Sequence, residues 1–407
     1  MATLGIDFGT SNTAAAYLTG GRPRLVQVEP GQTTLPTSVF FHYDAQAPLF
    51  GSAANQALIA GQEGRFMRAL KSVLGTSLMH ERRQIGYERQ TLVEVVAKFL
   101  KTVKDRAEAE TGQTFHDALS GRPVRFHSTD ASRNARAEND LRKAYQIAGF
   151  QDVRFLFEPA AAALTAGPLP AGGLGLIVDI GGGTSDFSVF SRDGNTTNVI
   201  ANHGVRIGGT DFDKALSIAH VMPLLGHKGL VRNELGSGTT TVPNALFHDL
   251  ATWEKIAFVY TPETARLVKM FCRQGVEPRG FERLASVIEM ETGHDIAFAV
   301  EAGKIAANSA DAAIDLAIVE PGLSPALTTM ALQADLAGFA QEIGACAKET
   351  LALAGVSQER ISQIVFVGGS SLMRIVGQTL SGLFPDATQE RASAFTAVAE
   401  GLARATV

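Results

Sequence analysis

The chain has 407 residues, 45% of them hydrophobic, which is enough to bury a sizeable core in two or more structural units. Its 36 Lys and Arg against 41 Asp and Glu give a net charge of −5, which excludes a general attraction to nucleic acid or to an anionic membrane. Two cysteines exclude a disulfide framework and lack metal-ligand spacing, so we expect a cytoplasmic protein. We expect neither a secretory signal nor a membrane span.

Two segments share one pattern, LGIDFGTSNTAAAYL at 4–18 and LIVDIGGGTSDFSVF at 176–190. In both, apolar residues lead to an aspartate, another apolar residue, a glycine and a turn of small residues, and a second apolar stretch follows. Alternation around a glycine-rich turn predicts a β-hairpin in each case. The repeat therefore predicts two related lobes.

Helical patterns lie between the two hairpins. Apolar residues recur at helical spacing from Leu92 to Val103, and residues 132–148 form a second predicted helix. VRFLF at 153–157 predicts a buried strand, and EPAAAALTAG after it predicts a helix with proline in its first turn.

The second half of the chain follows the same alternation. Residues 168–175 are rich in turn-forming residues, and we place the boundary between the lobes there. ISQIVFV at 361–367 predicts a strand ending in GGSS, and residues 392–404 predict a last helix. Strands that alternate with helices indicate an α/β fold.

The strand ends carry residues suited to a nucleoside triphosphate. Consecutive glycine amides form a nest for phosphate oxygens, and Asp7 and Asp179 would attract Mg²⁺ beside a polyphosphate. Each glycine-rich segment taken singly is more often a plain hairpin turn. Two copies with an aspartate at the same offset favour the phosphate site, and the sequence has no P-loop motif.

Four ordered motifs resemble the phosphate and adenosine motifs of the actin, hexokinase and heat-shock ATPase superfamily. They are DFGTSN at 7–12, DIGGGTSD at 179–186, GGTDFD at 208–213 and GGS at 368–370. GGTDFD, EPAAAA at 158–163 and VEAGKIAANS at 300–309 resemble DnaK-type heat-shock chaperones. GRPVRF at 121–126 and PNALFHDLATWEKI at 243–256 are similar to the short, YegD-type branch of that family.

The resemblance implies an α/β, two-lobed actin-like ATPase fold of duplicated ribonuclease H-like domains, with nucleotide in a cleft between the lobes. The expected organisation is lobe I at 1–172 with an insert at about 33–115, lobe II at 173–390 with an insert at about 210–305, and a C-terminal helix at 391–407 that returns toward lobe I. We expect no substrate-binding domain to follow.

The resemblance also implies site residues. The catalytic set is Lys71, Glu158, Asp179 and Thr184, and Asp7 and Asp179 would organise Mg²⁺ through water. The nucleotide-binding set is Gly9, Thr10, Ser11, Asn12, Gly181, Gly182, Gly183, Thr184, Gly208, Gly209, Glu301, Lys304, Gly368, Gly369 and Ser370.

Simpler roles compete for three residues. From the sequence alone Lys71 reads as a solvated lysine, and Glu158 as a helix-start residue favoured by the helix dipole. Asp186 could accept a proton or order water, or it could serve only the hairpin turn.

Departures from the family concentrate on the adenosine side. Ile305 and Leu372 stand where the family has arginines, and Phe395 stands where it has an aspartate. An apolar surface can stack on a purine but loses the planar contacts of a guanidinium. The family's lobe-coupling proline is not placed, because RFHSTD at 125–130 stands where its motif is expected.

The sequence thus favours Mg²⁺-dependent ATP binding and slow hydrolysis by a chaperone-like conformational switch with unidentified protein partners. A nucleotide sensor with little or no ATPase activity is the first alternative. A small-molecule kinase of the same superfamily is a further one, for which Asp186 is the one candidate base.

Overall fold

The structure is a computed structural model that describes residues 2–44, 47–127, 130–170, 172–193, 196–233, 237–391 and 396–406. The described parts of residues 1–209, 341–372 and 376–407 form one compact unit. Residues 210–340 and 373–375 form a second compact unit, within the same described ranges. Each unit is described below by itself.

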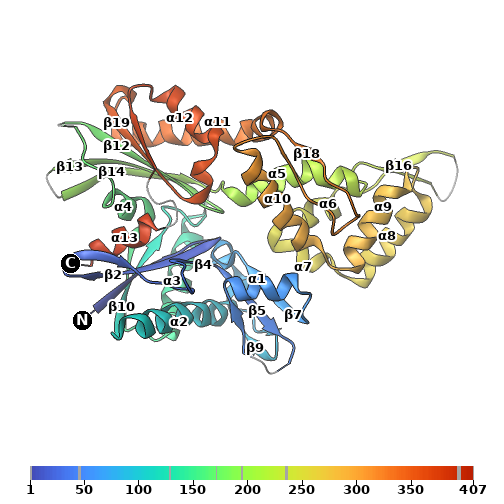
Figure 1. Ribbon diagram of the computed structural model, residues 1–407, viewed down its shortest axis with the longest axis horizontal. Helices are drawn as coiled ribbons and strands as arrows, with labels where there is room; N and C mark the ends of the chain where they lie inside the picture. Colours follow the sequence, from blue (N-terminus) through green and yellow to red (C-terminus); the bar gives the residue numbers. More distant parts are fainter. Residues whose placement is uncertain are drawn as a thin grey trace. The chain divides into compact units, whose positions relative to one another are not determined.

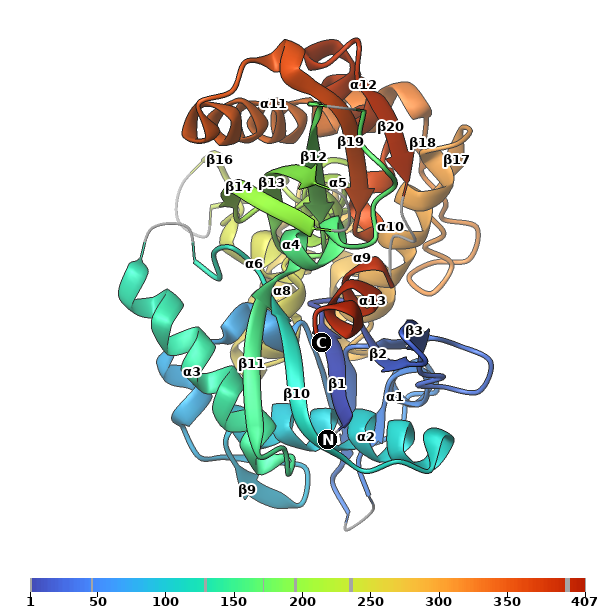
Figure 2. The same ribbon diagram turned by 90° about the vertical axis from the view of Figure 1, so that its left-hand side faces the viewer.

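The first unit contains two five-membered strand paths of the same design. In the first sheet the order is β11-β10-β1-β2-β3, with β4 also pairing β2. Its members are β1 (Ala2–Phe8), β2 (Asn12–Thr19), β3 (Arg22–Leu25), β4 (Thr34–Pro36), β10 (Phe115–Arg122) and β11 (Asp152–Phe157). β1, β2 and β3 are antiparallel neighbours, whereas β10 and β11 continue the sheet in parallel (Figure 2).

The second sheet repeats this arrangement with the order β14-β13-β12-β19-β20. Its members are β12 (Leu174–Ile180), β13 (Ser185–Asp193), β14 (Thr196–Val205), β19 (Ile361–Val367) and β20 (Thr388–Arg391). Again the first three strands are antiparallel and the last two are added in parallel. The two predicted hairpins, the α/β class and the duplication are therefore confirmed.

Helices of the first unit join the parallel strands. They are α2 (Leu92–Thr111), α3 (Ala131–Ile147), α4 (Glu158–Ala163), α12 (Arg374–Leu383) and α13 (Ala397–Arg404). Apolar residues of α2 pack on the first sheet, where the rings of Phe8 and Phe99 meet edge to face at 5.8 Å. The amphipathic spacing read from the sequence thus places one face of α2 in the core.

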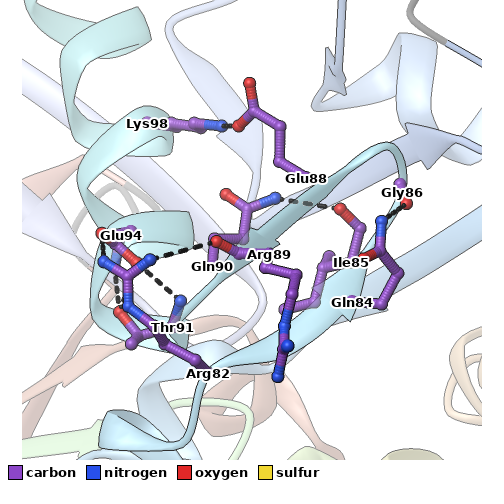
Figure 3. A network of polar contacts seen from close by, with 10 residues as sticks. All are labelled: Arg82, Gln84, Ile85, Gly86, Glu88, Arg89, Gln90, Thr91, Glu94 and Lys98. Carbon is purple, nitrogen blue, oxygen red and sulfur yellow. Dashed lines mark hydrogen bonds and ion pairs between the residues drawn. The ribbon is translucent and has the colours of Figure 1, made fainter.

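A smaller subdomain is inserted between β3 and α2. It contains β5 (Ser38–His42), β6 (Leu49–Phe50), α1 (Ser52–Ile59), β7 (Gly64–Arg68), the short 3₁₀ helices η1 (Leu70–Val73) and η2 (Ser77–His80), β8 (Arg83–Ile85) and β9 (Glu88–Gln90). Figure 3 shows how the β8–β9 hairpin is tied to the start of α2. Thr91 and Glu94 form a capping box there, and Lys98 pairs with Glu88 at 2.6 Å.

The second unit is mainly helical (Figure 1). Its elements are α5 (Gly209–Leu216), the π-helical η3 (Ser217–Val221), η4 (Met222–Leu225), β15 (Leu230–Arg232), β16 (Thr239–Thr241), α6 (Ala245–Leu250), η5 (Trp253–Lys255), α7 (Ile256–Val259), α8 (Pro262–Gln274), α9 (Pro278–Glu289), α10 (Gly293–Ala307), β17 (Ala312–Ala313), β18 (Ala326–Leu327) and the start of α11 (Thr329–Ala354). Among the helices of the described residues, none is long and apolar enough to cross a membrane.

Helix α13 packs between the first sheet and α4 in the first unit. Gly401 makes this possible, because a Cβ atom at that position would lie 1.8 Å from the carbonyl oxygen of Ala161 in α4. The close approach brings α4, which begins with Glu158, into a fixed position beside the first sheet.

We predict that Gly401→Ala lowers the free energy of unfolding by at least ~1–3 kcal/mol, because the added methyl group overpacks the contact between α13 and α4. Gly338→Ala is the matched control, since Gly338 lies in the middle of α11 and a Cβ atom added there would meet no atom within 4 Å. That variant should gain ~0.5–1 kcal/mol from helix propensity. Urea denaturation of both variants measures the difference, and equal effects would contradict the packing argument.

Candidate functional site

The two glycine-rich turns meet in the first unit. A Cβ atom on Gly182 would lie 2.3 Å from Ser11 Oγ and 3.5 Å from Thr10 Cβ, so any larger residue would require the Ser11 side chain to move. One on Gly183 would lie 3.5 Å from Thr10 Oγ1. The chain thus brings the turn after β1 against the turn after β12, although the two are about 170 residues apart in sequence.

The second turn is held by backbone hydrogen bonds. The Gly181 N–H donates to the Thr184 carbonyl oxygen at 3.0 Å, and the Gly209 N–H donates to the Gly181 carbonyl oxygen at 3.0 Å. A Cβ on Gly208 would lie 2.4 Å from the Gly183 nitrogen. Gly208 and Gly209 therefore lie directly against the turn that was predicted to bind phosphate.

The GGS segment after β19 lies beside the end of β12. A Cβ on Gly368 would be 2.4 Å from the Ile180 carbonyl oxygen and 2.8 Å from Asp179 Oδ1. Gly369 and Ser370 then begin the short 3₁₀ helix η7 (Gly369–Leu372). The two parallel neighbours β12 and β19 thus end together, as parallel strands do when they build a site at one sheet edge.

Lys71 and Glu158 form a buried ion pair in which Lys71 Nζ lies 2.6 Å from Glu158 Oε1. Their side chains are only 7% and 8% exposed. Lys71 lies in η1 of the inserted subdomain, and Glu158 is the first residue of α4. The reading of Lys71 as a solvated lysine is wrong, because the chain folds to bury it against a carboxylate 87 positions later in the sequence.

Three further carboxylates surround this pair. Asp7, the next-to-last residue of β1, lies beside Glu158, since a Cβ on Gly121 would lie 3.1 Å from Glu158 Cγ and 3.6 Å from Asp7 Oδ1. Asp179 and Asp186 are cross-strand partners in the second hairpin. The equivalent partner of Asp7 in the first hairpin is Ala14.

Burial and mutual repulsion shift the pKa values of these carboxyl groups. Burial, with the added charge of Glu158, raises the pKa of Asp7 and that of Asp186 to about 7 each. The same causes raise the pKa of Asp179 well above its ordinary value. Burial alone would lower the pKa of Lys71, but the charges of Glu158 and Asp7 raise it, so this lysine remains a cation.

The cluster is therefore short of positive charge, with one ammonium group among four carboxyl groups. A hydrated Mg²⁺ fits this donor set, because that ion prefers oxygen ligands and binds through one or two carboxylates, its own waters and substrate phosphates. Among the described residues no three His, Cys, Asp or Glu side chains form a group that could hold a metal ion directly. The role of Asp7 and Asp179 toward Mg²⁺ through water stays a prediction.

The loop after β10 was not recognised from the sequence. Pro123 follows β10 directly and is buried, and the N–H of Val124 donates to Asp186 Oδ1 at 3.0 Å. Through this hydrogen bond, the loop that leaves the first sheet contacts the second hairpin. The proline that follows Arg122 at the strand end is the sequence signal that could have indicated it.

The second unit carries the remaining predicted residues on α10. Lys304 is buried and pairs with Asp213 of α5 at 2.7 Å, whereas Ile305 is 62% exposed. Glu301 lies one turn before Ile305 on the same helix. Leu372 ends η7 in the first unit, and Phe395 lies outside the described residues.

The chain matches a known protein family over much of its length. The sequence model of the family described as "Hsp70 protein" matches residues 3–228, which is more than half of the chain. The match includes both hairpin turns, Lys71, Glu158 and the first helix of the second unit.

We predict that the nucleotide-free, metal-free protein loses stability as the pH rises from about 4 to about 7, because Asp186 and Asp7 hold protons in the folded state that they release in the unfolded state. Asp186→Asn removes part of this loss and keeps an acceptor for Val124. At about 1.4 kcal/mol per pKa unit, the gain at pH 8 has an upper limit of ~4 kcal/mol.

Urea denaturation at pH 5 and pH 8 measures this effect. Asp193→Asn is the control, because Asp193 lies exposed at the far end of the same strand. The argument fails if Asp186→Asn and the wild type lose the same stability between the two pH values.

Proposed function

Because the chain belongs to the Hsp70 family of nucleotide-binding chaperones and has its two-lobed actin-like ATPase fold, we propose that it binds and slowly hydrolyses ATP with Mg²⁺ as a conformational switch. The observation that carries the proposal is the buried Lys71–Glu158 pair, set among carboxylates beside two glycine turns that meet. The short YegD-type branch, protein clients and a cytoplasmic location are parts of the same proposal.

Phosphate binding falls to the two turns. The backbone amides of residues 9–12 and of residues 183 and 184 supply donors from both hairpins, and Thr10, Ser11 and Thr184 add hydroxyl groups. Gly181, where an added Cβ would meet only the Thr184 carbonyl oxygen at 3.9 Å, leaves room for a polyphosphate chain to approach the backbone. Gly208 and Gly209 support the second turn from behind, so its donors are oriented before the ligand arrives.

Hydrolysis needs a cation near the terminal phosphate and an acceptor for the proton of the attacking water. Lys71 supplies the cation, and its ion pair with Glu158 fixes where that charge lies. Asp186, with a pKa of about 7, suits the proton acceptor, because general bases work best near the operating pH. Bound Mg²⁺ would neutralise phosphate charge.

A nucleotide sensor that barely hydrolyses ATP is the second candidate. It is favoured by the adenosine-side residues, since Lys304 is engaged with Asp213 and Ile305 offers an apolar surface in place of a guanidinium. Calorimetry with ATP and ADP, followed by single-turnover hydrolysis, separates the two. Tight binding of both nucleotides without turnover would select the sensor.

We predict that Lys71→Ala lowers the rate constant of ATP hydrolysis by roughly 10²–10³-fold, because it removes the cation beside the developing charge. ATP should still bind, since both glycine turns are unchanged. The matched control is Lys98→Ala, which removes an exposed lysine of α2 that pairs with Glu88. A rate unaffected by Lys71→Ala would end the catalytic assignment.

We also predict that removal of Mg²⁺ with EDTA abolishes hydrolysis and that added Mg²⁺ restores it. The physical reason is the excess of carboxylates, which repels ATP unless a cation accompanies it. Asp179→Asn should raise the Mg²⁺ concentration needed for half-maximal activity, whereas Asp193→Asn on the adjacent strand should leave it unchanged. Full activity in EDTA would contradict the proposal.

A further inference from the structure

Helix α3 contacts both segments that carry the Lys71–Glu158 pair. The inference drawn from this rests on the proposed ATPase function, but it concerns residues outside the predicted catalytic and nucleotide-binding sets. α3 (Ala131–Ile147) contacts Gly75 in the loop that follows Lys71 and Arg122 at the end of β10. Its residues Glu138 and Asp140 are two positions apart, so their side chains leave the helix roughly 200° apart.

Asp140 contacts the segment of residues 72–76 that follows Lys71, here called the Lys71 loop. Its side chain is buried, Oδ2 accepts the N–H of Gly75 at 2.9 Å, and Oδ1 lies 2.9 Å from His80 Nε2. Gly75 packs so closely on α3 that a Cβ atom there would be 2.4 Å from the Arg133 carbonyl oxygen. Leu74, the residue before Gly75, makes a second contact on the same side of Lys71.

The carbonyl oxygen of Leu74 lies 2.7 Å from His127 Nε2, in the segment that leads into α3. The Leu74 N–H in turn reaches the Lys71 carbonyl oxygen at 3.4 Å. Gly75, which is attached to α3, therefore lies only four positions after Lys71. A buried carboxylate that accepts a buried backbone N–H leaves this attachment costly to break.

Glu138 acts on the segment that carries Glu158, and it does so through Arg122. The Arg122 guanidinium pairs with Glu138 and lies between the rings of Phe126 and Phe157, 5.3 and 5.1 Å from their centroids. Phe157 is the residue before Glu158 and the N-cap of α4. A planar cation stacked on that ring fixes the start of the helix from which Glu158 projects.

We propose that α3 positions the two members of the catalytic ion pair at once, with Asp140 acting on Lys71 and the Glu138–Arg122 pair acting on Glu158. Asp140, Glu138 and Arg122 are positioning residues. A displacement of either segment misplaces Lys71 relative to the reacting phosphate, and small misplacements of such groups reduce turnover strongly.

The test uses the full chain with Asp140→Ala and Arg122→Lys. Each should lower kcat by roughly 10–100-fold and change the Kd for ATP by less than about 3-fold, because the phosphate-binding turns are not touched. Asp140→Asn should recover part of kcat, since its amide oxygen can still accept from Gly75. Asp130→Ala is the matched control, because it removes the N-cap of the same helix, where Asp130 accepts the Arg133 N–H.

A double-mutant cycle distinguishes positioning from general destabilisation. In a Lys71→Ala background, Asp140→Ala should cause no further loss of turnover, whereas a purely structural effect would add to the loss. Hydrogen exchange should also quicken at amides 72–76 in Asp140→Ala but not in Asp130→Ala.

Each outcome decides one question. Unchanged kcat, additive losses or unchanged exchange at 72–76 would overturn the inference about α3. A wild-type protein without ATPase activity would overturn the proposed function, and exchange at 72–76 would still test the contact of Asp140 with the Lys71 loop.

Discussion

One buried ammonium group is the constraint on which the centre of the first unit depends. Lys71 is a cation among Asp7, Glu158, Asp179 and Asp186, and the fold tolerates that concentration of carboxyl groups because some of them keep their protons near neutral pH. A buried pair of this kind contributes little net stability. Its presence is better explained by what it does to a ligand than by what it does for the fold.

The rest of the unit is arranged to hold that group in place. Glycines allow the two hairpin turns to touch, and Gly401 allows α13 to pack closely on α4. Through Asp140, α3 contacts the loop after Lys71, and through Glu138 it contacts Arg122 at the end of β10. Rigid backbone contacts of this kind limit the motion of the charged side chains, which a preorganised electrostatic site requires.

The parts that sequence predicted are those governed by local pattern. Alternating apolar residues around glycines predicted both hairpins, and the four-residue turn 181–184 already implies that Asp179 faces Asp186. The burial of Lys71 could not be read in the same way, because it depends on Glu158, 87 residues away. Local helix-like sequence gives no information on such a partner, and only the motif spacing pointed to it. The positioning contacts of Asp140 and Arg122 have no local signal either.

The two sheets share a strand order but not the chemistry of their first hairpins. Where Asp179 faces Asp186 across the second hairpin, Asp7 faces only Ala14 across the first. Two sheets of the same strand order present equivalent positions to a ligand. The two ends of a linear polyphosphate differ, however, and each end needs different side chains beside it. Under the proposed function, the methyl group of Ala14 in place of a carboxylate leaves Asp186 as the proton acceptor on one side alone.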